Sequence, residues 1–115
     1  MKTRLFSVTI ILVMKESRQL EFKEQVTSTF LKTVSAFANY NGGQIIFGIS
    51  DDGSCSPLQN LQQVCLDIEN RVNDSITPQV DFSLTVNEKN GTVVLTVQAG
   101  ATKPYLYKSK AYIKK

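Results

Sequence analysis

Two stretches of the chain place apolar residues on one face of an amphipathic helix. The first comprises Val26, Phe30, Leu31, Val34, Phe37 and Ala38, and the second comprises Leu61, Val64, Cys65, Ile68, Val72 and Ile76. Apolar positions that recur with a period near 3.6 give a helix one face to bury, so both stretches are predicted to be helices. Gly42 and Gly43 are expected to end the first helix, because glycine accepts the left-handed backbone found there. Pro78 is expected to stop the second.

Shorter stretches have the patterns of β-strands. Some alternate polar with apolar residues, and one is almost wholly apolar, as in a strand covered on both faces. The expected strands span residues 19–23, 45–49, 80–86, 92–97, 104–107 and 111–113. Asn90-Gly91 lies between two of them and gives the strongest hairpin signal in the sequence.

This order of elements predicts an α+β fold. We expect a mixed β-sheet of about five to six strands, with the two helices packed mainly on one face. A length of 115 residues is enough for one domain with a modest core. Apolar content of 42% and charged content of 20% are ordinary for a globular protein.

The N-terminal residues 1–13 have two interpretations. Two basic residues precede an apolar run from Leu5 to Val13, which is too short to span a bilayer and has no small-residue cleavage site after it. The run is either a strand packed on the domain or a mis-assigned leader ahead of a true start at Met14. We therefore place the domain at residues 14–115, and we expect it to be a fragment of a longer protein.

The net charge of +3 does not by itself imply a partner, but its distribution is uneven. Residues 14–102 contain ten acidic and six basic residues, whereas residues 103–115 contain five lysines and no acid. This segregation favours a basic patch beside an acidic one. The alternative is that the terminal lysines keep an edge strand soluble.

The two cysteines and the lack of histidine exclude several kinds of site within this chain. Cys55 and Cys65 lack CxxC spacing, and there is no histidine for a zinc finger or a histidine-dependent triad. Cys65 falls on the apolar face of the second predicted helix, where a reduced, buried thiol is expected. The simplest expectation is a cytoplasmic protein.

Acidic residues near two predicted strands could form a metal site. Glu16 and Glu21 flank the first strand, and Asp51-Asp52 follow the strand at 45–49. If those strands are neighbours, three acids could converge at one sheet edge and bind Mg²⁺ or Mn²⁺, which prefer oxygen ligands and promote phosphodiester cleavage. The alternative is an ordinary Asp-Gly turn and two solvated glutamates.

Lysines and tyrosines alternate near the C-terminus. Lys103, Lys108 and Lys110 are interleaved with Tyr105 and Tyr107. Lysines contact phosphates and tyrosines stack on bases, so the pattern is a candidate nucleic-acid-binding surface. The alternative is that the tyrosines pack on the core while the lysines decorate an edge strand.

Four motifs in order give the chain a family resemblance. They are ESxxxEFK from Glu16, SAFAN from Ser35, the pair Gly42-Gly43, and FGIxDDG from Phe47. From about Glu16 onward the chain resembles the Schlafen-type Alba-like domain, also called the divergent AAA domain, of predicted bacterial and archaeal transcriptional regulators and helicase-related proteins.

The resemblance implies a nucleic-acid-binding module, for DNA or RNA, in a predicted transcriptional regulator. It implies that an ATPase-like region and a winged helix belong to the full-length protein. A second implication is a divalent-metal-dependent endoribonuclease, with Glu16, Glu21 and, aligned on Gly48, Asp51 as catalytic and metal-binding residues. Because animal Schlafens form a groove from two such lobes, a single lobe would need a homodimer or the rest of the protein. A third hypothesis, which does not depend on the resemblance, is a dimerisation or scaffold domain.

Overall fold

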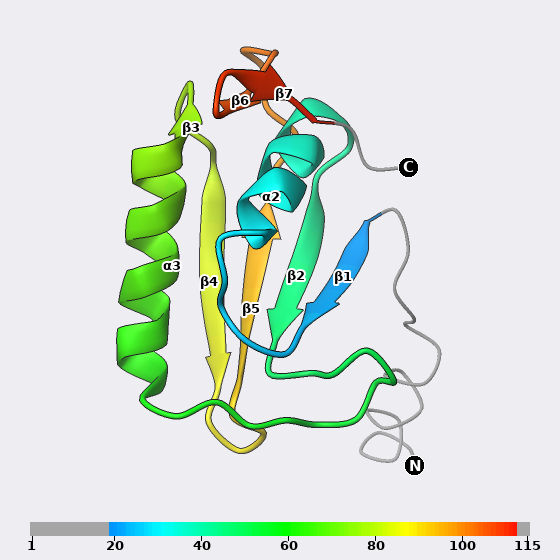
Figure 1. Ribbon diagram of the computed structural model, residues 1–115, viewed down its shortest axis with the longest axis vertical. Helices are drawn as coiled ribbons and strands as arrows, with labels where there is room; N and C mark the ends of the chain where they lie inside the picture. Colours follow the sequence, from blue (N-terminus) through cyan, green and yellow to red (C-terminus); the bar gives the residue numbers. More distant parts are fainter. Residues whose placement is uncertain (1–18, 113–115) are drawn as a thin grey trace.

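The computed structural model describes residues 19–112 as an α+β domain with two helices, which confirms the predicted fold class (Figure 1). The elements, in chain order, are β1 (Leu20–Lys23), α2 (Phe30–Asn39), β2 (Gly43–Phe47), α3 (Leu61–Ser75), β3 (Ile76–Thr77), β4 (Phe82–Asn87), β5 (Thr92–Val97), β6 (Leu106–Tyr107) and β7 (Lys110–Ala111). None of the helices among these residues has the length and apolar character needed to cross a membrane.

The main sheet has four strands in the order β1-β2-β5-β4. β1 runs parallel to β2, whereas β2 with β5 and β5 with β4 are antiparallel, so the sheet is mixed as predicted. The hairpin expected around Asn90-Gly91 is confirmed by the pairing of β4 with β5. β1 and β4 are therefore the two outer strands.

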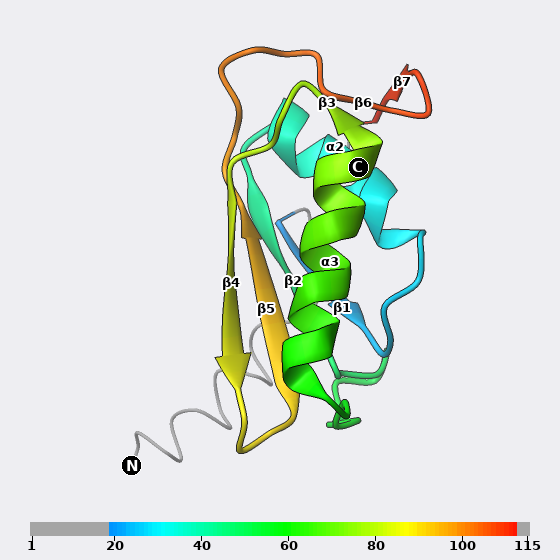
Figure 2. The ribbon, with the colours of Figure 1, turned by 90° about the vertical axis from the view of Figure 1, so that its left-hand side faces the viewer.

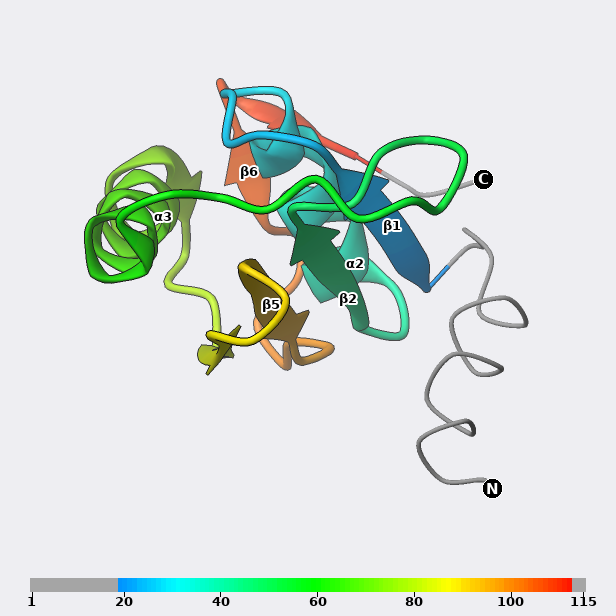
Figure 3. The same ribbon diagram turned by 90° about the horizontal axis from the view of Figure 1, so that it is seen from below.

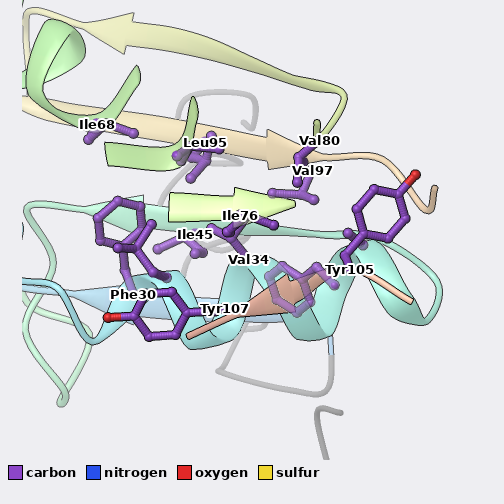
Figure 4. Packing of buried hydrophobic residues seen from close by; sticks show 14 of the residues in the cluster. Phe30, Val34, Ile45, Ile68, Ile76, Val80, Leu95, Val97, Tyr105 and Tyr107 are labelled. Carbon is purple, nitrogen blue, oxygen red and sulfur yellow. The ribbon is translucent and has the colours of Figure 1, made fainter. Parts of the chain in front are cut away.

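Both helices pack on one face of the main sheet (Figure 2). The apolar residues of α2 and α3 lie against the side chains of β2 and β5 that point to the same face, and the resulting core extends to Tyr105 and Tyr107 (Figure 4). Phe30, Ile45, Ile68 and Leu95 are fully buried there. This packing follows from the helical and alternating patterns of the sequence.

Helix α2 begins at Phe30, four residues later than its apolar pattern suggested. The preceding residues form a turn in which the amides of Phe30 and Leu31 donate to the carbonyl oxygens of Thr27 and Ser28. Val26 still packs against the core from this turn. An apolar side chain can therefore satisfy the helical period without lying in the helix.

The two glycines after α2 serve different purposes. Gly42 has a φ of +78°, and its amide donates to the carbonyl oxygen of Phe37 at 2.8 Å, which confirms the expected glycine at the helix end. Gly43 is instead the first residue of β2, and a β-carbon there would lie 2.7 Å from the Phe37 ring. Close packing rather than backbone conformation requires glycine at this second position.

The C-terminal strands do not extend the main sheet. They form a small second sheet in the order β3-β6-β7, which lies beside the C-terminal ends of both helices (Figure 1). Of the strand expected at residues 111–113, Ala111 lies in β7 and Tyr112 follows it, while Ile113 lies outside the described residues.

Two polar residues of α2 hold this C-terminal segment in place. The buried Ser35 hydroxyl donates to the carbonyl oxygen of Tyr105 at 2.9 Å. The Asn39 amide nitrogen donates to the same oxygen at 2.9 Å and to that of Tyr112 at 3.3 Å. The Asn39 side-chain oxygen accepts from the Tyr105 amide at 2.6 Å. These contacts tie the segment that carries most of the predicted lysine–tyrosine residues to the helix.

We expect Asn39→Ala to destabilise the domain by about 2–3 kcal/mol, because it leaves the main-chain groups of the buried Tyr105 short of partners. Asn41→Ala is the matched control, since Asn41 is exposed two residues further on. Urea denaturation followed by circular dichroism measures both. Equal midpoints for the two variants would show that the Asn39 contacts contribute nothing to stability.

Candidate nucleic-acid interface and acidic residues

The β6–β7 hairpin presents two of the predicted lysines. Lys108 and Ser109 form its two-residue turn with φ values of +53° and +65°. Positive φ at both turn positions matches the right-handed twist of the flanking strands, which permits so short a connection. Lys108 and Lys110 are exposed on this hairpin.

A third lysine joins them from helix α2. The Lys32 ammonium lies 6.0 Å from the centre of the Tyr112 ring, and the Lys108 ammonium lies 5.4 Å from that of Tyr107. The two rings are 6.2 Å apart. We call these residues, together with Lys110, the lysine–tyrosine surface. The sequence analysis did not include Lys32 among the candidate binding residues. Lys32 is one of several polar residues on the exposed face of the helix, and nothing in the sequence distinguishes it from the others.

The other two predicted residues, Tyr105 and Lys103, contact residues that are not part of this surface. Tyr105 is 4% exposed, and its hydroxyl accepts a hydrogen bond from the Thr102 amide at 3.2 Å. Hydrogen bonds to the Thr102 hydroxyl and amide hold the pKa of the Tyr105 phenol below its ordinary value. The Lys103 ammonium donates to the carbonyl oxygen of Tyr40 at 3.4 Å.

The two predicted stacking tyrosines are both core residues. Tyr107 is 6% exposed, and it packs in the same apolar cluster as Tyr105 (Figure 4). A buried ring has no free face on which a base can stack. Both tyrosines therefore fit the alternative interpretation, in which they pack on the core. Tyr112 is only partly buried and is the more accessible ring of the lysine–tyrosine surface.

Of the three acids predicted to bind metal, Glu16 lies outside the described residues. Glu21 is on the outer strand β1, where its carboxylate accepts from the Thr33 hydroxyl at 2.9 Å and pairs with the Lys23 ammonium at 3.3 Å. Its side chain is 12% exposed. Glu21 sits opposite the buried Ile45, so it lies on the helix-covered side of the sheet.

Asp51 lies in the loop that leaves β2 and passes below the strand ends to α3 (Figure 3). Its neighbour Asp52 is occupied, since it accepts hydrogen bonds from the hydroxyls of Ser54 and Ser50 and from the Ser54 amide. The Ser54 hydroxyl first, and then that of Ser50, lower the pKa of Asp52 to about 2. Asp51 is exposed and makes no hydrogen bond or ion pair with the described part of the chain.

The strand arrangement meets one condition of the metal hypothesis, because β1 and β2 are parallel neighbours. Within residues 19–112, no three acidic or cysteine side chains are grouped closely enough to hold a metal ion. The triad as predicted includes Glu16, so its convergence stays a prediction.

Three comparisons identify proteins that are similar to this chain. A curated relative, an uncharacterized ATP-binding protein of Ureaplasma parvum, is 32% identical over 98 residues, which cover 70% of this chain and 27% of the relative. The chain thus spans about a quarter of that relative's length.

Two solved structures share the fold. The N-terminal domain of a protein related to the ATP-dependent DNA helicase RecG, from Nitrosomonas europaea, matches with a TM-score of 0.62 and 21% identity, over 100% of this chain and 90% of that one. A protein of Corynebacterium diphtheriae matches with a TM-score of 0.55 and 18% identity, over 91% of this chain and 23% of its own.

The family assignment comes from the chain's own sequence over the whole of the described domain. The family model for Schlafen, AlbA_2 matches residues 16–115, which include all four motifs and both helices. The chain belongs to the Schlafen, AlbA_2 family.

Proposed function

We propose that this domain binds nucleic acid, DNA or RNA, through the lysine–tyrosine surface, as a module of a transcriptional regulator. The observation that carries the proposal is the convergence of Lys32 from α2 with Lys108 from the β6–β7 hairpin on a pair of neighbouring tyrosines. Ammonium groups held on one surface neutralise successive phosphates, which supplies most of the affinity of non-specific binding.

The rings help to position the cations. An ammonium within about 6 Å of an aromatic centre is attracted to the ring face, so each lysine is biased toward its tyrosine. Lys110 adds a further cation on the same hairpin. Because Tyr107 is buried, the proposed contact is with phosphates rather than with stacked bases.

The description of one relative supports this ligand class, and that of another supports an ATPase-like region in the full-length protein. The Nitrosomonas structure is a domain of a DNA-helicase-related protein, and the Ureaplasma relative is described as ATP-binding. As the family resemblance implies, we propose that the full-length protein contains an ATPase-like region and a winged helix, and that the domain acts in the cytoplasm.

Binding should weaken steeply with salt and depend on the three lysines. For the double variant K108E/K110E we expect affinity for a mixed-sequence DNA or RNA duplex to fall by roughly tenfold or more at low salt, with a shallower salt dependence, because two phosphate contacts are lost. K32E should weaken binding in the same direction. Fluorescence anisotropy across a salt series measures the affinity.

Lys89→Glu is the matched control, because Lys89 is an exposed lysine in the β4–β5 turn, at the other end of the main sheet (Figure 1). It changes the net charge as each single reversal does. If K89E weakened binding as much as K32E, the affinity would follow net charge and the proposed surface would be wrong.

A second candidate function is the metal-dependent ribonuclease. The parallel pairing of β1 with β2 favours it, because the strand that carries Glu21 adjoins the strand that Asp51 follows. Hydrogen bonds within its own loop engage Oδ1 of Asp52, whereas Asp51 is exposed, so Asp51 is the more open acid of the pair. We propose that Glu16, Glu21 and Asp51 would bind Mn²⁺ or Mg²⁺ in that case.

This candidate predicts cleavage of structured RNA that requires Mn²⁺. Glu21→Ala and Asp51→Ala should each slow cleavage by roughly a hundredfold or more, as for the loss of a group that orients the reacting water. Glu24→Ala removes an exposed acid near the end of β1 and should leave the rate unchanged. Gel assays with and without EDTA report the outcome, and cleavage that persists in E16A, E21A and D51A alike would end the assignment.

A further inference from the structure

The outer edge of β4 is open along its whole length. β4 is the last strand of the main sheet, and within residues 19–112 no strand pairs with its outer side (Figures 1 and 2). Its pairing with β5 runs over six residues without a bulge, and Phe82–Asn87 contains no charged residue and no proline. Edge strands are commonly protected by such residues, so an unguarded edge is a site for strand addition.

A groove follows this edge, with helix α3 as its other wall. One cavity of about 450 Å³ is lined by Glu69 and Asn73 of α3 and by residues 79–84. A second cavity of about 660 Å³ lies further toward the start of α3, between residues 60–63, Leu66 and Glu88. Leu66 and Glu69 are one helical turn apart, so the two cavities are neighbours along α3. We call the pair the edge groove.

Two apolar side chains, one in the edge groove and one beside it on β4, are left uncovered. Leu66 on the helix is 51% exposed and Val86 on the strand is 39% exposed. They are two of the three large apolar residues that are exposed in the described part of the chain. Phe82 and Leu84, which are partly buried, alternate with Ser83 and Thr85, and they face the helix side together with Val86. A strand laid against β4 would cover this apolar row.

The edge groove is acidic. Glu69, Asp81 and Glu88 line it. Arg71, on the same helix, forms an ion pair with Asp67 at 2.9 Å. Its charge is therefore largely compensated by Asp67 and does not neutralise the three acids of the groove. β4 carries no basic residue, so a second copy of the chain added at this edge would bring two acidic grooves together. Charge complementarity therefore favours a basic occupant over self-association.

We propose that the edge groove binds an extended basic segment of a partner protein, which adds to the main sheet as a strand beside β4. Main-chain hydrogen bonds to β4 would supply affinity, as in other cases of strand addition. Apolar side chains of the segment would cover Leu66 and Val86, and its lysines or arginines would face the acids. The lysine–tyrosine surface takes no part, so this inference is independent of nucleic-acid binding.

The probe is a capped peptide of about eight residues, enough to span β4, in which lysine and valine alternate. We expect its titration into the isotope-labelled 115-residue chain to shift the amide resonances of Phe82–Asn87 and of α3. A peptide with glutamate in place of lysine, and one with alternate main-chain nitrogens methylated, should both fail to bind.

Charge reversal in the protein tests the same contact. The double variant E69K/D81K should weaken binding of the lysine–valine peptide by roughly tenfold or more, since two favourable charge pairs become unfavourable. Glu24→Lys, at an exposed site near the end of β1, changes the net charge as either single reversal, E69K or D81K, does, and it should bind as the unaltered chain does. If a variant fails to fold, the methylated peptide still tests the proposal, because it is titrated into the unaltered chain.

Three results would overturn the proposal. The first is equal binding of the lysine and glutamate peptides. The second is undiminished binding of the methylated peptide, which would exclude strand addition. The third is sedimentation showing that the chain dimerises through β4, detected as a dimer that Val86→Lys dissociates.

Discussion

The hydrogen bonds from Ser35 and Asn39 to the main chain of Tyr105 are the constraint on which the candidate interface depends. They join residues far apart in sequence, and they do so where Tyr105 is buried and water cannot replace them. Without them the segment after β5 would be held by the core packing of Tyr105 and Tyr107 and by short strand pairings, and the buried main chain of Tyr105 would lose hydrogen-bond partners. With them, the β6–β7 hairpin has a fixed position beside α2.

The same contacts give a physical meaning to the SAFAN motif. Phe37 and Ala38 are buried in the core as the helical pattern predicts, whereas Ser35 and Asn39 are polar residues beside that face. Their side chains reach the C-terminal segment rather than solvent. One short helix therefore serves both the core and the hairpin that carries Lys108 and Lys110.

Local patterns predicted much of this fold. The apolar face of α3 and the alternation in β4 and β5 were sufficient to identify these elements, because burial of one face of a helix or strand imposes a period on the sequence. The separate C-terminal sheet was not predictable in this way. Its position depends on hydrogen bonds between Asn39 and Tyr105. The sequence around either residue does not indicate that the two are in contact.

The residues of the candidate sites also fall into two groups, those that the sequence indicates and those that only the tertiary structure brings together. Lys108 and Lys110 stood out because basic residues cluster in the tail, but Lys32 is brought to them only by packing of the hairpin on α2. The edge groove left only a weak signal, because Leu66 is an apolar residue off the predicted apolar face of α3, whereas Val86 simply continues the alternation of β4. Exposure of an apolar side chain depends on which strand is outermost, and that is a property of the sheet order.

The near balance of charge from Met14 onward does not argue against a phosphate-binding surface. At physiological salt an exposed charge is screened within about 8 Å, whereas a six-residue strand such as β4 is about 20 Å long. Glu88, in the β4–β5 turn, lies at the opposite end of the main sheet from the β6–β7 hairpin (Figure 1). A phosphate at the hairpin is therefore screened from the acid of that turn, and the nearby lysines contribute more to its binding than Glu88 does. The acids along α3 and β4 can in turn select a basic ligand, so one nearly neutral domain can present two surfaces of opposite preference.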